Sequence, residues 1–194
     1  MNSWYDDYVL RLIDCQDCKR DIQQLFPVLT DAYPDGLCYL PSEEIKLMFV
    51  AEAPGLGNEV GPVTNREVAV RDFKLHEWLN YLKGNGQDFK KDSYGRFVFK
   101  VVSALENLGY PLDWGKIAVT NCIKFPIPKR CDINTKMKIA LNHQMTHLAE
   151  EFQYSKPKVV IALGSTAINT IQHMSKNKFI TYERLIKLPH QYGS

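Results

Sequence analysis

The sequence alternates short apolar runs with stretches of helical periodicity, and this alternation constrains the fold more than any other feature. The apolar runs are predicted strands, at residues 45–50, 117–121, 159–163 and 185–188. The predicted helices cover residues 2–26, 67–83, 97–108, 132–154 and a segment that begins near Ser165. Strands that are apolar along their whole length are typical of parallel sheets with helices on both faces. The pattern therefore predicts a single α/β domain over residues 1–194, a three-layer α/β/α sandwich around a mainly parallel four-stranded sheet.

Composition and charge narrow the class of protein further. Of the 194 residues, 45% are hydrophobic, which is enough to build a core and argues against disorder. No apolar run approaches the roughly 20 residues that span a bilayer, and the acidic, aromatic amino-terminal sequence does not resemble a signal peptide. We therefore expect a cytoplasmic protein without a membrane partner. The formal net charge is +2, so nucleic-acid binding would require a local basic patch.

The cysteines are the first candidate ligands. An odd number of cysteines without a secretion signal argues against a disulfide framework. Cys15 and Cys18 form a CxxC motif, a spacing that allows both thiolates to reach one metal ion or iron–sulfur cluster. The alternative is that both are ordinary reduced thiols. The other three cysteines are Cys38, Cys122 and Cys131.

Polar residues that follow the predicted strands are the candidate site, because binding sites of parallel sheets form at the carboxyl ends of the strands. Glu52, held by a Pro-Gly turn, can position water or stabilise a cation, although a solvated turn glutamate is the alternative. Asn121 carries a donor and an acceptor, so it can read the edge of a nucleobase. His190 can donate a hydrogen bond to a developing negative charge, unless it is only a surface residue.

Two further segments are candidate contacts for phosphate groups. A basic cluster follows the second predicted strand, at Lys124, Lys129 and Arg130. These residues offer a phosphate contact, or they are the ordinary lysine and arginine side chains of a proline-stiffened surface loop. Gly164 and Ser165 begin a predicted helix, where free backbone N–H groups can bind an anion. A simple helix N-cap at Ser165 or Thr166 explains the same residues.

Five motifs, taken in their order along the chain, resemble the uracil-DNA glycosylase superfamily and most closely its iron–sulfur branch. They are EAPG at 52–55, GRF at 95–97, TNCIKFPIPKR at 120–130, KPKVVIALGSTA at 156–167 and LPHQ at 188–191. The resemblance extends from about residue 45 to residue 190. It implies a monofunctional DNA glycosylase, which hydrolyses the N-glycosidic bond of a flipped-out base and leaves an abasic site. Such chemistry needs no cofactor.

The resemblance also implies roles for individual residues. Glu52 matches the glutamate that helps to position the attacking water, His190 the histidine that stabilises charge on the leaving base, and Asn121 the asparagine that hydrogen-bonds the base. The aromatic residue that stacks on the base matches Phe97, or Phe99 if the register slips. The implied base-binding set also contains Ala53 and Gly55, and the implied DNA-binding set contains Gly164, Ser165, Lys124, Lys129, Arg130 and Tyr192. Tyr192 is a candidate wedge for the gap that the flipped base leaves.

The cluster ligands of the iron–sulfur branch are only half present. Cys15 and Cys18 match two of its four cysteines, but Phe125 occupies the position of the third, and residues 141–144 contain no cysteine. The other candidate ligands are Cys122, Cys131 and His143. The sequence therefore argues against an intact four-cysteine cluster and leaves zinc or no metal as the alternatives.

Two more departures concern the expected pocket. Residues 58–93 are inserted relative to the family pattern and include the predicted helix 67–83. We expect this segment at the mouth of the pocket, as a lid or as a means to accommodate a base larger than uracil, with a plain surface helix as the alternative. The family's proline after the motif histidine is missing, because Gln191 follows His190.

These departures leave several functions open. The excised base is expected to be uracil or a bulky modified pyrimidine, including a hypermodified phage cytosine, with a role in DNA repair or in antiviral defence. We expect a monomer that binds DNA in a prokaryotic or phage-type setting. The alternatives are a non-catalytic nucleic-acid-binding protein on the same fold, or an enzyme that traps the sugar covalently on His190 or Glu52.

Overall fold

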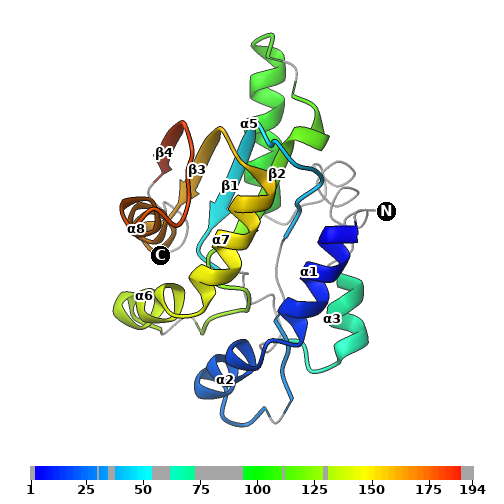
Figure 1. Ribbon diagram of the computed structural model, residues 1–194, viewed down its shortest axis with the longest axis vertical. Helices are drawn as coiled ribbons and strands as arrows, with labels where there is room; N and C mark the ends of the chain where they lie inside the picture. The colour runs from blue at the N-terminus through cyan, green and yellow to red at the C-terminus, as the bar shows by residue number, and fades with distance from the viewer. Residues whose placement is uncertain are drawn as a thin grey trace.

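The computed structural model describes residues 3–29, 31–34, 38–53, 62–72, 94–110, 112–128 and 131–188 (Figure 1). The helices are α1 (Ser3–Ile13), α2 (Gln16–Leu25), α3 (Arg66–Asp72), α5 (Tyr94–Asn107), α6 (Ile133–Leu141), α7 (Gln144–Ser155) and α8 (Ser165–Lys176). The strands are β1 (Leu47–Ala51), β2 (Ile117–Asn121), β3 (Val159–Leu163) and β4 (Arg184–Leu188), and a short 3₁₀ helix, Trp114–Lys116, precedes β2. None of the helices in these ranges is long and apolar enough to cross a membrane.

The four strands form one parallel sheet in the order β2-β1-β3-β4. The central strand β1 is paired on both sides, so that Phe49 lies opposite Val119 of β2 and Ile161 of β3. Every residue of β1 and of β2 is buried, which explains why both strands appear in the sequence as uninterrupted apolar runs. The predicted α/β class and the four-stranded parallel sheet are confirmed.

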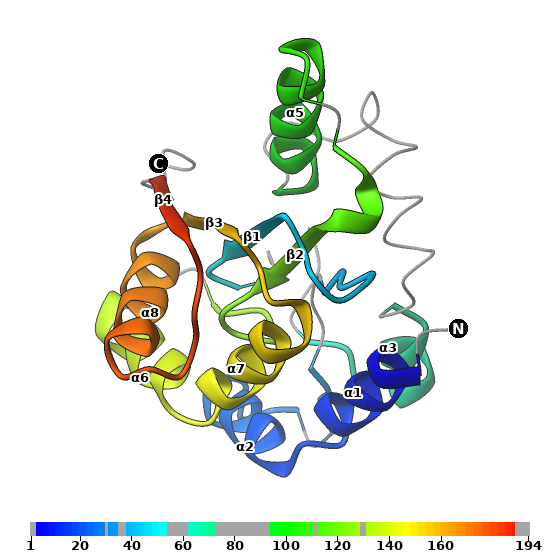
Figure 2. The ribbon, with the colours of Figure 1, turned by 45° about the horizontal axis from the view of Figure 1, so that its top comes forward.

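Helices cover both faces of the sheet (Figure 2). On one face, Phe49 and its neighbours pack against Val98 and Val102 of α5. On the other face, Met48 and Val50 belong to the larger core, to which α1, α7 and α8 contribute buried side chains. Figure 2 shows α5 on one side of the sheet and these three helices on the other, which is the predicted three-layer arrangement.

Two predicted helices are each divided into two in the structure. The prediction of one helix over residues 2–26 is wrong, because α1 ends at Ile13 and α2 begins at Gln16, with Cys15 in an extended conformation between them. The prediction of one helix over residues 132–154 is also wrong, because Asn142 leaves the helical conformation between α6 and α7. The apolar periodicity continues across both breaks, so it does not mark them.

Three other boundaries bear on the predicted site. Helix α5 ends at Asn107, and Gly109 follows with φ of 82°, as expected of a glycine just past a helix end. The N-cap of α8 is Gly164 rather than Ser165 or Thr166, and no side chain caps this helix. The described part of the inserted segment 58–93 contains α3, which lies beside α1 (Figure 1). An ion pair joins Arg66 of α3 to Asp14, directly after α1.

Candidate functional site

Glu52 and Asn121 lie next to each other at the carboxyl edge of the sheet. Asn121 is the last residue of β2 and pairs with Ala51, the last residue of β1, which Glu52 follows directly. The two chains stay paired beyond the strands, because Cys122 N–H donates to Ala51 O (2.8 Å) and Ile123 N–H donates to Glu52 O (2.9 Å). The structure thus brings together two of the residues that the sequence singled out.

The two side chains have different surroundings. Asn121 is almost completely buried, with 1% of its surface exposed. The Glu52 carboxylate is about one-fifth exposed and forms an ion pair with Lys136 of α6, with 2.5 Å between Nζ and Oε1. Lys136 was not predicted as a site residue, because α6 carries several polar side chains and nothing in their spacing distinguishes this one. The ammonium compensates the negative charge of Glu52 and limits its orientation.

Lys124 differs from its predicted role as a DNA contact. Its side chain is only 2% exposed and forms an ion pair with Glu151 of α7, which is completely buried, at 2.8 Å. Lys124 Nζ also donates to Thr120 Oγ1 (2.7 Å) and to the carbonyl oxygen of Asn121 (2.6 Å). A buried charge requires such partners. Lys124 therefore holds the loop after β2 from inside the protein and is not a surface contact for phosphate.

The remaining predicted contacts are only partly described. Gly164 follows β3 at the same edge as Glu52 and donates to Leu188 O (3.0 Å), and Ser165 beside it is exposed. Phe97 packs edge-to-face against Phe49, with 6.3 Å between ring centroids. Ala53 and Phe99 are partly buried. Five predicted site residues lie outside the described part of the chain: Gly55, Lys129, Arg130, His190 and Tyr192.

A second group of functional side chains joins the start of α2 to the start of α7. The possible ligand atoms of Cys15, Cys18, His143 and His147 all lie within 4.8 Å of one another. Cys18 Sγ is 3.3 Å from His143 Nε2 and 3.5 Å from His147 Nε2. Four convergent ligands of this kind can hold a metal ion.

Two of these side chains, Cys15 and His143, have pKa shifts that favour the form that binds a metal. Cys15 Sγ accepts a hydrogen bond from the Cys18 thiol and another from the Cys18 backbone N–H, at 3.4 Å. These hydrogen bonds lower the pKa of Cys15 to about 3. The same hydrogen bond, together with burial, raises the pKa of Cys18. Burial lowers the pKa of His143, whose Nδ1 lies 3.4 Å from Asp21 Oδ2. A thiolate and a neutral imidazole are the forms that bind metal ions.

The donor set does not fit the four-cysteine cluster that the family resemblance implies. Two donors are imidazoles, and Phe125, at the position of a family cysteine, is buried in the core. His143 was one of the candidate ligands, but His147 was missed. The signal that could have found it is a CxxC motif followed by two histidines in an HxxxH spacing, a known zinc pattern.

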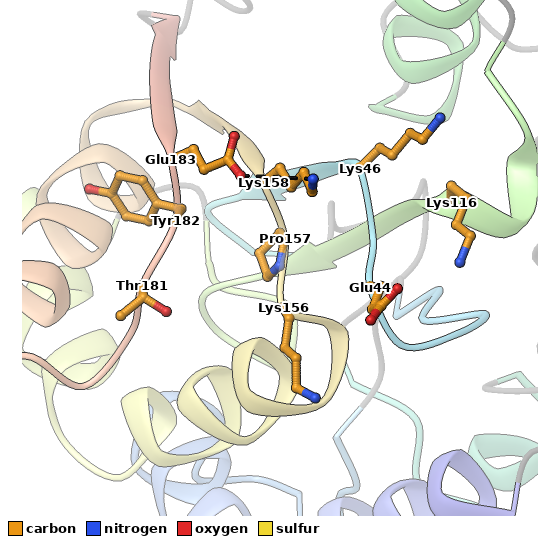
Figure 3. A pocket seen from close by; sticks show the side chains of 9 residues that line it. All are labelled: Glu44, Lys46, Lys116, Lys156, Pro157, Lys158, Thr181, Tyr182 and Glu183. Carbon is orange, nitrogen blue, oxygen red and sulfur yellow. Dashed lines mark ion pairs between the residues drawn. The ribbon is translucent and has the colours of Figure 1, made fainter.

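A hollow of about 630 Å³ lies at the opposite edge of the sheet (Figure 3). Among its lining residues are Lys46, Lys116 and Lys158, each of which directly precedes a strand. The lining is completed by Glu44, Lys156, Pro157, Thr181, Tyr182 and Glu183. Because this hollow is at the amino ends of the strands, Glu52 and Asn121 do not face it.

A comparison with models of known protein families finds no match, and a comparison with curated proteins finds none either. The resemblance to the uracil-DNA glycosylase superfamily therefore stays a prediction that is based on the five motifs.

Proposed function

We propose that the protein is a monofunctional DNA glycosylase that hydrolyses the N-glycosidic bond of a flipped-out uracil or modified pyrimidine. The observation that supports this most strongly is that Glu52, with a partly exposed carboxylate, and the buried Asn121 lie next to each other. They lie at the ends of two adjacent parallel strands, which is the usual place for a site in such a sheet. A partly exposed carboxylate beside a buried, base-reading amide suits the excision of a base.

Each side chain has a part in the proposed reaction. Cleavage leaves an oxocarbenium-like sugar and an anionic base. The Glu52 carboxylate positions the attacking water and stabilises the cationic sugar, while the Asn121 amide hydrogen-bonds the edge of the base. His190 is proposed to donate a hydrogen bond to the leaving base. Flipping the base costs a few kcal/mol, which the contacts in the pocket must offset.

Two lysines support these roles. Lys136 holds the Glu52 carboxylate through their ion pair. Lys124 donates to the main-chain oxygen of Asn121 while Glu151 compensates its charge. Fixed side chains of this kind lower the cost of organising the site during reaction.

The proposal covers two kinds of base, uracil and a bulky modified pyrimidine. Residues 58–93 are the part of the chain that we expect to distinguish them, as a lid or as one wall of a larger pocket. A role in repair follows from excision of uracil, and a role in antiviral defence follows from excision of a hypermodified cytosine.

An excision assay tests the proposal. The protein is incubated with duplexes that carry uracil, hydroxymethylcytosine or a glucosylated cytosine, and abasic sites are detected by alkaline cleavage. Glu52→Gln should lower the excision rate about 10²- to 10⁴-fold, the range expected for a residue that activates water. The control is Glu183→Gln at the opposite edge of the sheet, which should leave the rate unchanged.

Three outcomes would contradict the proposal. DNA binding without excision of any of the three bases would favour a non-catalytic binding protein. A protein–DNA adduct that survives denaturation would favour covalent trapping of the sugar. Excision by Glu52→Gln at the wild-type rate would show that the catalytic carboxylate is elsewhere.

We also propose that the group of two cysteines and two histidines serves a structural metal rather than the excision chemistry. Its four residues belong to α2 and α7 and the turns before them, whereas the proposed catalytic residues follow the strands. It would fasten the amino-terminal helices to the rest of the domain.

A further inference from the structure

We propose that Cys15, Cys18, His143 and His147 bind a single Zn²⁺ ion that fastens α2 to α7. The four residues come from segments more than a hundred positions apart in the sequence, yet their ligand atoms lie within 4.8 Å of one another. Figures 1 and 2 both show α2 next to the lower end of α7.

The distances fit a tetrahedral zinc site. Zinc binds sulfur at about 2.3 Å and nitrogen at about 2.1 Å, which separates the two ligand atoms by about 3.6 Å at a tetrahedral angle. The observed separations of Cys18 Sγ from His143 Nε2 and His147 Nε2 are 3.3 and 3.5 Å. Only small side-chain adjustments are therefore needed for binding.

The chemistry of the donors selects among metals. Thiolate and imidazole together suit zinc, whereas magnesium and calcium prefer oxygen ligands. A four-iron cluster takes four thiolates. A two-iron cluster with the same donors binds its thiolates on one iron and its imidazoles on the other. The short distances between Cys18 and both histidines leave no room for such a cluster.

The surroundings of the four ligands resemble those of metal sites. His143 Nδ1 lies 3.4 Å from Asp21 Oδ2, and both atoms are buried without a hydrogen-bond partner in the part of the chain that the structure describes. A small movement would form the hydrogen bond that a metal-bound histidine commonly donates to a carboxylate. Cys15 is the N-cap of α2, where the positive end of the helix dipole stabilises a thiolate. These contacts orient ligands from both segments.

Gln144 connects this group to the centre of the domain. Its side chain is completely buried, its Nε2 lies 3.2 Å from Cys18 Sγ and 2.6 Å from His143 Nε2, and its Oε1 accepts from Lys124 N–H at 3.1 Å. A zinc ion at the four ligands would therefore also stabilise the loop after β2. Since a structural zinc contributes directly to folding stability, its removal should destabilise the whole chain.

The first experiment measures the metal content of the full chain, purified without chelators, by mass spectrometry. We expect one zinc per chain, little iron and no acid-labile sulfide. Stoichiometric iron with sulfide, or a folded protein with no metal that also fails to take up added Zn²⁺, would refute the proposal. No DNA substrate is involved, so the result is independent of the proposed excision activity.

Matched variants then test the ligands. Cys15→Ser and His147→Gln should each lower the affinity for Zn²⁺, measured by competition with a chelator, at least about 10-fold, given that even loss of a residue that orients a ligand costs 10- to 100-fold in affinity. The controls are Cys131→Ser and His173→Gln, which replace a partly buried cysteine and an exposed histidine outside the group and should retain one zinc.

Cobalt substitution keeps the test decisive if a ligand variant does not fold. Wild-type protein that is stripped of zinc and loaded with Co²⁺ should show the intense visible absorbance of a tetrahedral site with thiolate ligands. Added Zn²⁺ should displace the cobalt and abolish the absorbance. A weak, octahedral cobalt spectrum would refute the proposal.

Discussion

Replacing Lys124 by methionine tests the buried ion pair that holds the loop after β2. The substitution keeps the length of the side chain but removes the charge that faces Glu151. Glu151 has no exposed surface, so water cannot replace the lost ammonium. The carboxylate keeps three donors: the Tyr8 hydroxyl at 2.5 Å, the Thr120 hydroxyl at 2.8 Å and the Cys38 thiol at 3.2 Å.

The expected loss of stability follows from this geometry. Removal of one partner from a buried ion pair typically costs about 3–5 kcal/mol, because the other charge stays buried without compensation. Because three donors still bind the Glu151 carboxylate, we expect the stability loss in Lys124→Met to be near the lower end of this range, at about 3 kcal/mol. For a protein of this size, each kcal/mol lowers Tm by about 2–4 °C, so Tm should fall by about 6–12 °C.

Urea denaturation followed by circular dichroism measures this loss at neutral pH. The matched control is Lys158→Met, because Lys158 is 64% exposed and lies 3.9 Å from an exposed Glu183. This control should change stability by less than about 0.5 kcal/mol. Adding Glu151→Gln to Lys124→Met should recover much of the loss, because the buried carboxylate is then neutral. A loss below about 1 kcal/mol in Lys124→Met would refute the reasoning.

Three further predictions concern separate parts of the molecule. Gly164→Ala should cost about 1–3 kcal/mol, since φ of 85° and ψ of 161° are accessible almost only to glycine, and an unchanged urea midpoint would contradict this. Hydrogen bonds from Arg66 lower the pKa of Asp14 in the folded protein. The ion pair therefore stabilises the fold above the unfolded pKa of about 3.9, and this stabilisation is lost as the pH falls through the folded pKa. The stability difference between wild type and Asp14→Asn should therefore disappear as the pH falls into the acid range. A difference that stays constant across this range would argue against the ion pair. At mildly alkaline pH a maleimide should label the partly exposed Cys131 in the native protein. Cys122 should react only after unfolding, because burial raises its pKa to about 12. Mass spectrometry of the labelled protein measures both reactions.

The sheet could be predicted from the sequence because its strands are defined locally. Residues 117–121 and 159–163 are strands at the predicted positions, and the other two differ by one or two residues. Strands β1 and β2 are buried along their whole length and β3 in its centre, so the hydrophobic run itself marks where these strands lie, whereas the edge strand β4 is partly exposed. Once four such runs alternate with helices, few arrangements other than a parallel sheet remain. The same reasoning led to Glu52 and Asn121, which follow β1 and end β2.

Lys124 was placed wrongly because its environment depends on contacts that are distant in the sequence. A lysine beside prolines and other basic residues is usually solvated, and full burial of lysine is rare without a partner. The partner, Glu151, lies on α7, on the polar part of what the periodicity presented as one long amphipathic helix. Nothing local to either residue reports that the two side chains meet inside the protein.

The two helix breaks and the missed histidine have one physical explanation. A continuous helix through Cys15 would carry no N-cap there, and the Cys18 N–H would bond within the helix instead of donating to Cys15 Sγ. A continuous helix through His143 would likewise remove the start of α7, where His143 and Gln144 face Cys18. In both places the chain gives up helical hydrogen bonds, which is favourable only if the exposed groups gain other partners. A metal ion bound by all four side chains would not pair these backbone groups, but its binding free energy would offset the cost of both breaks. The interruptions in the helices are therefore consistent with the proposed zinc site.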